Sequence, residues 1–128
     1  MRLLLDTHAF LWWLAGDEAL SETSRQGIKT DADAIFVSAA SVWEISTKHR
    51  LGKLPGAGAI VGDMAEAIAS QGFVGLPIEV RHAQAAGALP GPRRDPFDRM
   101  LIAQALMEDL LLVSNERAFE AYGVRRLW

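Results

Sequence analysis

Several residue types are absent or scarce in this 128-residue chain, which contains no cysteine, one tyrosine and three histidines. Without cysteine it has no disulfide framework, no thiolate metal site and no thiol nucleophile. No hydrophobic run approaches the roughly 20 residues that a membrane-spanning helix needs. Polar residues at positions 6–8 interrupt the first apolar stretch, so it does not fit a signal peptide. These absences predict a cytoplasmic protein without a membrane partner.

The charge balance argues against one further class of protein. Sixteen acidic residues stand against thirteen lysines and arginines, giving a net charge of −3. A protein that coats nucleic acid needs a cationic surface to neutralise phosphates, so this balance argues against one. It is compatible with an enzyme whose acidic residues gather at one site. Half of the residues are hydrophobic, which is enough for the core of a single domain spanning residues 1–128.

Short apolar segments alternate with helical patterns along the chain. Strands that are apolar throughout need cover on both faces, so this alternation predicts an α/β fold with a mostly parallel sheet between helices. We expect strands at 2–5, 34–38 and 110–114, a strand or turn at 73–77, and a terminal strand at 124–128. We expect helices at 7–15, 21–29, 41–54, 59–72, 79–89, 97–109 and 115–123, with loops at 55–58 and 90–96.

Acidic residues recur where these strands end. Asp6 ends the first predicted strand, Glu44 follows the second by about one helical turn, and Glu116 follows the third. Asp95 and Asp98 begin the helix that precedes the third strand. In a parallel sheet the carboxyl ends of the strands share one edge, where ligands bind. We therefore expect carboxylates from four separate segments to converge there.

Each of these residues also has an interpretation as a helix cap. Asp and Ser accept hydrogen bonds from the free N–H groups of a first helical turn, and a Glu three residues after a Ser completes a capping box. Capping does not exclude metal binding, because both place oxygen atoms at junctions between strands and helices. The candidate caps are Asp6 or Thr7, Ser41 with Glu44, Asp95 before Pro96, and Ser114.

A cluster of carboxylates repels itself unless protons or a cation neutralise it. Oxygen ligands favour Mg²⁺ or Mn²⁺, and the scarcity of histidine together with the absence of cysteine argues against zinc. A divalent cation held in this way promotes the attack of water on a phosphodiester. The pattern therefore favours a metal-dependent hydrolase of phosphodiesters.

Four segments carry a family resemblance: LLLDTHAFLWWL, VSAASVWEISTKHRLGKL, DPFDRMLIAQA and LLLVSNERAFEAYGVRRLW. In order and spacing, over nearly the whole chain, they resemble the PIN-domain ribonucleases, and among these the VapC-type toxins of type II toxin–antitoxin systems. The resemblance implies a PIN-like three-layer α/β/α sandwich and cleavage of RNA with Mg²⁺ or Mn²⁺. It also implies a cognate antitoxin protein as partner, and a homodimer.

The resemblance also implies roles for individual residues. Asp6, Glu44 and Asp98 match the catalytic metal ligands of the family. Ser114 and Glu116 stand where the family usually has Thr-x-Asp, so the longer Glu116 side chain is expected to reach the metal directly, through water, or not at all. The supporting residues are Asp95, Ser114, Thr7 and Lys48.

The surroundings of the acidic residues leave some interpretations open. Lys48 lies four residues after Glu44, which predicts either a helix-surface ion pair or a phosphate contact. Basic clusters at 93–99 and 48–53 are interpreted as contacts for an RNA backbone. Residues 10–14 are apolar around the first predicted helix, which predicts burial on several sides, within the domain or against a second copy or an antitoxin.

Two alternative functions are also compatible with the sequence. One is a phosphatase with Asp6 as nucleophile, although Thr7 and His8 do not continue a DxD motif. The other is a degenerate PIN-like module that binds RNA or a protein partner without cleavage, which the Glu116 substitution favours. No serine elbow accompanies the histidines, which excludes a serine–histidine triad.

Overall fold

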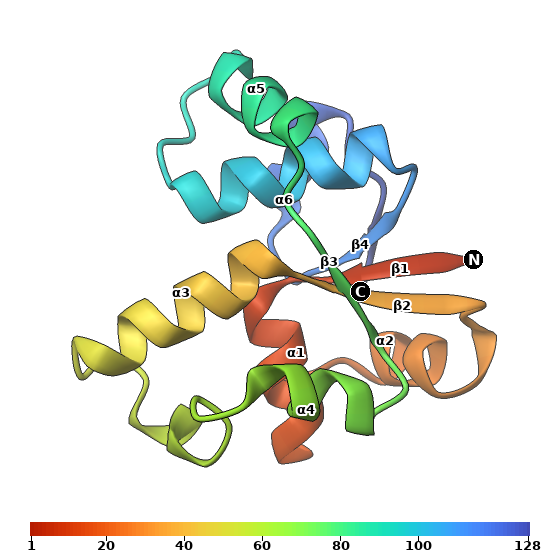
Figure 1. The fold of residues 1–128 in the computed structure, drawn as a ribbon. Helices are drawn as coiled ribbons and strands as arrows, with labels where there is room; N and C mark the ends of the chain where they lie inside the picture. Colours follow the sequence, from red (N-terminus) through yellow and green to blue (C-terminus); the bar gives the residue numbers. More distant parts are fainter.

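The computed structural model describes all 128 residues and contains one five-stranded parallel sheet with helices on both faces (Figure 1). The strand order is β3-β2-β1-β4-β5, so the first strand of the chain lies at the centre. None of the helices combines the length and apolar character needed to cross a bilayer. The strands are β1 (Arg2–Leu5), β2 (Ala34–Ser38), β3 (Val74–Leu76), β4 (Leu111–Val113) and β5 (Arg126–Leu127).

The helices form two layers, as the alternation of elements predicts. In Figure 1, α1, α2 and α4 lie below the sheet, and α5 and α6 lie above it. The α-helices are α1 (Thr7–Ala15), α2 (Glu22–Gln26), α3 (Ala39–Arg50), α4 (Met64–Ser70), α5 (Val80–Ala88) and α6 (Pro96–Met107). A π-helical turn (Gly27–Asp31) extends α2, and 3-10 helices occupy Pro55–Ala59 and Arg117–Tyr122.

Two hydrophobic clusters explain why β1 is apolar at every position after Arg2. Leu3 and Leu5 pack in one cluster with Phe10 of α1, whereas Leu4 packs in the other with Ile102 of α6. All three leucines are fully buried. Successive side chains of a strand point to opposite faces, so a strand covered on both faces needs no polar position.

The register of the sheet places three polar residues at one level of its carboxyl edge. Leu5 pairs with Val37 on one side and with Val113 on the other. The residues that follow these three are Asp6, Ser38 and Ser114. The Asp6 N–H group also donates to the Val113 carbonyl at 3.0 Å, which fixes the point where β1 passes into α1.

The helix predicted at 59–72 is wrong in its first half. α4 begins only at Met64, where the Asp63 carboxylate accepts a hydrogen bond from the Glu66 N–H group. The preceding 55–58 segment, expected as a loop, lies within the 3-10 helix. Ile60 and Val61 pack against the core from the turn between the two helices. Their apolar spacing therefore reflects burial in the core, although these residues are not helical.

The start of α3 also differs from the expectation. The helix begins at Ala39, and the hydroxyl of Ser38 accepts from the Ala40 N–H group as the cap. The capping-box alternative for Ser41 and Glu44 is therefore wrong, because both lie inside the helix and are buried. The last predicted helix is a 3-10 helix that begins after Glu116.

The apolar residues of α1 are covered within the domain. Phe10 is fully buried, and Trp12 and Trp13 are partly buried against the core cluster. The Trp13 indole N–H group donates to Gln71 at 2.9 Å, and the Trp12 and Trp128 rings lie 5.9 Å apart. The domain itself therefore satisfies much of the burial that this helix requires.

Candidate active site

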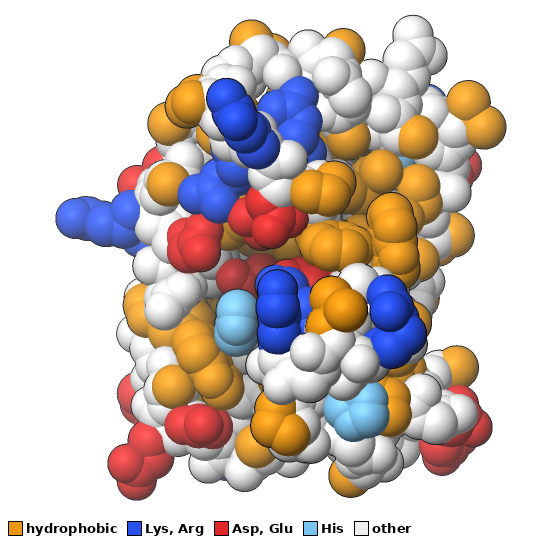
Figure 2. All heavy atoms as spheres, turned by 90° about the vertical axis from the view of Figure 1, so that its left-hand side faces the viewer, with side chains coloured by type: hydrophobic (Ala, Val, Ile, Leu, Met, Phe, Trp, Pro, Cys, Tyr) orange, Lys and Arg blue, Asp and Glu red, His pale blue; other side chains and the backbone are white.

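A polar cavity of about 100 Å³ lies at the carboxyl edge of the sheet and has no hydrophobic residue in its lining. This edge is on the left of Figure 1, where β1 and β2 end. Figure 2 views that side and shows acidic side chains in a central hollow, with lysine and arginine side chains above and below it. The lining residues are Asp6, Thr7, His8, Glu44, Lys48, Asp95, Asp98 and Glu116.

The cavity brings together seven of the eight residues proposed from the sequence as ligands or supporting groups. The eighth, Ser114, lies directly behind it, fully buried at the end of β4. His8 is the additional lining residue, and its position directly after Asp6 and Thr7 is the only sequence signal for it.

Asp6 acts as a cap and also faces the cavity. One carboxylate oxygen, Oδ1, accepts from the Ala9 N–H group at 2.8 Å, which caps α1. The residue is only 8% exposed, and this burial raises the pKa of the Asp6 carboxyl group. Hydrogen bonds from the Ser114 hydroxyl and the Ala9 N–H group oppose the rise. The capping prediction and the convergence of acidic residues therefore both apply to Asp6.

The amino end of α6 presents two carboxylates. Asp95 caps the helix, because its Oδ1 accepts from the N–H groups of Phe97 at 2.8 Å and Asp98 at 3.1 Å. Asp98 follows in the first turn and lines the cavity. Burial and the neighbouring charge of Asp95 raise the pKa of Asp98 to about 6, against the opposing influence of Arg93.

Glu44 reaches the cavity from the inner side of α3 and is only 5% exposed. Thr7 donates its hydroxyl to Glu44 Oε1 at 2.5 Å, and Lys48 Nζ donates to Glu44 Oε2. The hydrogen bond to Glu44 raises the pKa of the Lys48 ammonium group. The ion pair predicted for Lys48 is present, and because its acidic partner is buried it differs from an ordinary surface pair.

Arg93 occupies a position that the sequence did not indicate. Its Nη1 lies 2.7 Å from Asp98 Oδ2 and 3.1 Å from Glu116 Oε2. The Glu116 side chain is 49% exposed at the rim of the cavity, and Arg93 is its ion-pair partner there. Arg93 was expected as one cation of the basic cluster at 93–99. Its contacts with Asp98 and Glu116 were not expected, because a loop has no periodicity that indicates the direction of a side chain.

The donor set of the cavity suits a hard divalent cation. Five carboxylates line it and no sulfur ligand is present. Only Lys48 and Arg93 make ion pairs with these carboxylates, so negative charge remains in excess. Oxygen-rich sites of this kind bind Mg²⁺ or Mn²⁺ in preference to softer metals. Asp6, Glu44, Asp98 and Glu116 are the residues that could hold it.

A second cluster of possible ligands lies elsewhere and was not expected from the sequence. Glu79, His82 and Glu108 place one ligand atom each within 4.8 Å of one another. His82 is already committed, since Nδ1 accepts from the Glu79 N–H group and Nε2 lies 2.9 Å from Glu108. Arg81 pairs with both glutamates, so this group is explained as the cap of α5 and its ion pairs.

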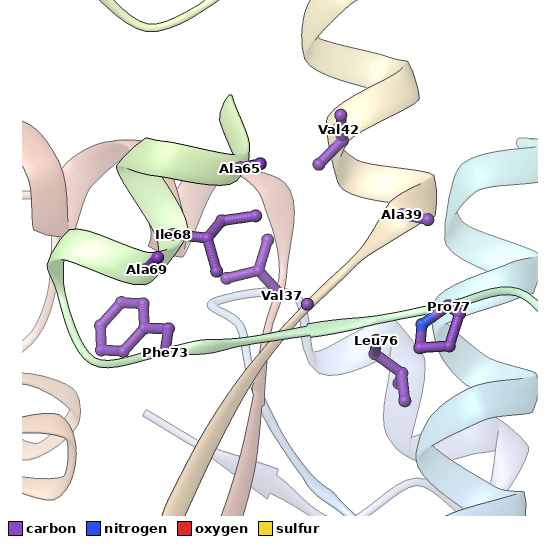
Figure 3. A pocket seen from close by; sticks show the side chains of 10 residues that line it. Val37, Ala39, Val42, Ala65, Ile68, Ala69, Phe73, Leu76 and Pro77 are labelled. Atoms are coloured by element: carbon purple, nitrogen blue, oxygen red, sulfur yellow. The ribbon is translucent and has the colours of Figure 1, made fainter. Parts of the chain in front are cut away.

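One open groove of the molecule is apolar. It measures about 520 Å³, and Figure 3 shows side chains from α3, α4 and the strands β2 and β3 around it. No acidic or basic residue lines it, so it offers no group for hydrolysis. Its lining consists of Val37, Ala39, Val42, Ala65, Ile68, Ala69, Phe73, Gly75, Leu76 and Pro77.

The fold and the cavity together define an α/β domain with an acidic site at the carboxyl edge of a parallel sheet. Residues 3–124 match the PIN domain family, and the chain therefore belongs to this family. PIN domains are typically nucleases and are generally metal-dependent.

The chain is also similar to individual proteins of known name and structure. The chain is 29% identical over 121 residues to Ribonuclease VapC22 of Mycobacterium tuberculosis, covering 94% of this chain and 91% of that protein. VapBC2 from Rickettsia felis, solved with a promoter DNA fragment, superposes with a TM-score of 0.71 at 14% identity, with full coverage of both chains. DNA-bound VapBC from Salmonella typhimurium superposes with a TM-score of 0.67 at 18% identity, covering 98% of this chain and 96% of that chain.

Proposed function

We propose that this protein is a Mg²⁺- or Mn²⁺-dependent endoribonuclease that hydrolyses RNA phosphodiester bonds as the toxin of a toxin–antitoxin pair. The observation that carries the proposal is the cavity itself, in which four elements far apart in sequence present carboxylates to one polar space. Helix caps alone do not require this, because a cap needs only a local acceptor and no common direction.

In this proposal Asp6, Glu44 and Asp98 hold the cation, and Glu116 contributes at the rim. A bound divalent cation activates water for attack on phosphorus and shields the charge of the phosphate. The Asp6 oxygen that faces the cavity keeps its direction because Oδ1 is tied to the Ala9 N–H group. No covalent intermediate with the enzyme is needed, which separates this mechanism from a phosphatase that uses Asp6 as nucleophile.

The supporting residues keep the carboxylates in place. Thr7 and Lys48 each bind one oxygen of Glu44, which prevents rotation of its carboxylate. Asp95 fixes the first turn of α6 and thereby the position of Asp98. Such partners of metal ligands typically change metal affinity or activity about 10- to 100-fold when they are removed.

The biological role is proposed from the relatives. VapC22 is named a ribonuclease, and the solved neighbours are VapBC complexes with DNA. We therefore propose a cognate antitoxin as partner, a homodimeric toxin, and RNA in the cytoplasm as the substrate. The lysine and arginine side chains on both sides of the acidic hollow are suited to contact the phosphates of an RNA strand (Figure 2).

The first experiment measures cleavage of a mixed-sequence RNA with Mn²⁺, with Mg²⁺ and with a chelator. We expect cleavage only with metal, and a loss of more than about 100-fold in Asp6→Asn and Asp98→Asn. Asp31→Asn removes the same charge from an exposed position outside the cavity and should cleave like the wild type. RNA binding without metal-dependent cleavage would favour a non-cleaving module. A trapped phosphoaspartate at Asp6 would favour a phosphatase.

A second experiment tests the toxin role in cells. Induced expression of the wild type should stop growth, and expression of Asp6→Asn should not. If a small gene lies next to this one and encodes the antitoxin, its co-expression should restore growth. If the wild type cleaves RNA in solution but does not slow growth, the proposed nuclease activity stands and the proposed toxin role is refuted.

A further inference from the structure

The guanidinium group of Arg93 contacts carboxylate oxygens for which a metal cation bound at this site would have to compete. Its Nη1 contacts Asp98 Oδ2 and Glu116 Oε2, two of the oxygens offered to a metal. Its Cζ lies 4.8 Å from the centre of the Phe119 ring, which supports the flat side of the group. The side chain is 20% exposed, so one of its faces is open to solvent.

The loop around Arg93 is held from both sides. The Arg93 N–H group donates to the Tyr122 hydroxyl at 2.9 Å, and the Arg93 carbonyl accepts from Arg99 Nη1 at 2.8 Å. Gly91 has φ of +106°, and a Cβ there would lie 2.8 Å from the Tyr122 hydroxyl. Only glycine therefore allows Tyr122 to approach this loop and fix the base of the Arg93 side chain.

An arginine in this position can leave the carboxylates only by moving. Its guanidinium stays protonated at any pH the protein meets, so it cannot yield its place by losing a proton. A divalent cation that takes the oxygens of Asp98 and Glu116 repels it. The partner that guanidinium groups bind most readily after a carboxylate is a phosphate, through paired hydrogen bonds.

We propose that Arg93 is an exchangeable counterion of the active site. In the metal-free protein it neutralises Asp98 and Glu116, and when a cation takes over these carboxylates it transfers its hydrogen bonds to a phosphate of the bound RNA. This inference rests on the proposed function, and it adds a positioning residue that competes with the metal before the substrate arrives.

The test compares Arg93→Gln with Arg94→Gln, which removes the same charge from the next residue. Arg94 is exposed and makes no hydrogen bond or ion pair. Calorimetric titration with Mn²⁺ in the absence of RNA should show the dissociation constant of Arg93→Gln about three- to tenfold lower than that of the wild type. Arg94→Gln should stay within about twofold, because its charge is more distant and screened.

Thermal unfolding separates this exchange from a merely structural ion pair. Without metal, Arg93→Gln should melt below the wild type, and saturating Mn²⁺ should raise its midpoint by more than it raises that of the wild type. An equal loss of midpoint with and without Mn²⁺, with unchanged affinity for Mn²⁺, would refute the competition. Tyr122→Phe, which frees the Arg93 N–H group, should shift Mn²⁺ affinity in the same direction by a smaller factor.

The transfer to phosphate has its own measurement. At saturating Mn²⁺, Arg93→Gln should raise KM for RNA about tenfold, although its site binds the metal more tightly. An unchanged KM would refute the transfer. If the wild type neither binds Mn²⁺ nor cleaves RNA, the proposed function fails and takes this inference with it. If the wild type does both and Arg93→Gln behaves like Arg94→Gln, the inference alone fails.

Discussion

Raising the pH should weaken the metal-free protein through Asp98. The folded state raises the pKa of this carboxyl group from its ordinary 3.8 to about 6, mainly through burial and secondly through the charge of Asp95. A group whose pKa is higher in the folded state holds its proton more tightly there. Its contribution to stability is therefore complete below about pH 4 and is lost as the pH rises through about 6.

The size of the effect follows from the shift and from the exposure of the side chain. The rise of the Asp98 pKa from 3.8 to about 6 corresponds to at most about 3 kcal/mol of folding free energy, at about 1.4 kcal/mol for each tenfold change in proton affinity. The Asp98 side chain is 23% exposed and pairs with Arg93, so solvent screens part of this free energy. We expect about 1–2 kcal/mol after that discount.

The assay is urea unfolding of the wild type and Asp98→Asn in a chelating buffer, from about pH 4 to about pH 7.5. The asparagine variant cannot ionise, so it should equal the wild type at the acid end and exceed it by about 1–2 kcal/mol at the neutral end. Taking the difference between the two proteins removes the contributions of all other titrating groups. Asp31→Asn, an exposed change of the same kind, should show no such widening.

One result would refute this reasoning. If Asp98→Asn is less stable than the wild type at neutral pH, and the deficit grows with pH, the carboxylate stabilises the fold as part of the first turn of α6. Asp98 would then be a structural residue of α6, and the case for a metal ligand at this position would weaken.

Three further outcomes are expected. Mn²⁺ at about a hundred times its dissociation constant should stabilise the wild type by about 2.7 kcal/mol in a thermal scan, and Asp6→Asn should show little of this gain. Thr7→Val keeps the shape of the side chain but removes the 2.5 Å hydrogen bond to Glu44, so urea unfolding should show a loss of about 1–2 kcal/mol; no loss would mean that Lys48 alone satisfies that carboxylate. Gly91→Ala places a Cβ against Tyr122 at a positive φ, and a loss of about 1–3 kcal/mol by the same assay is expected, whereas an unchanged midpoint would show that the loop adapts freely.

The sheet and its acidic edge were predictable because few arrangements satisfy strands that are apolar at nearly every position. After Arg2, segment 2–5 has only leucines, which lie on both faces of the strand, so it had to be covered on both sides, and it is the central strand of a parallel sheet. Once the strands are parallel, Asp6 and Glu116 must lie near one edge. Topology alone therefore placed these carboxylates near each other, without any knowledge of packing.

Details that depend on competition between local signals were not predictable. Ser38 and Ser41 are both good caps, and the hydroxyl of the last residue of β2, Ser38, is the one that caps α3. Ile60 and Val61 carry helical spacing, but Asp63 caps a later start and ends that pattern. Arg93 lies in a loop whose path depends on Tyr122, about thirty residues later, and sequence spacing cannot reveal such a contact.

The central place of β1 has a consequence for how the protein is made. Residues 2–5 are synthesised before the rest of this domain, yet they gain their second neighbouring strand only when residues 111–113 have been synthesised. Until then one edge of β1 has no strand to pair with, and Glu116 has not yet joined Asp6 at the cavity. A nascent chain therefore cannot assemble the complete acidic cavity before Glu116 has been translated, so the site forms late in the synthesis of this domain.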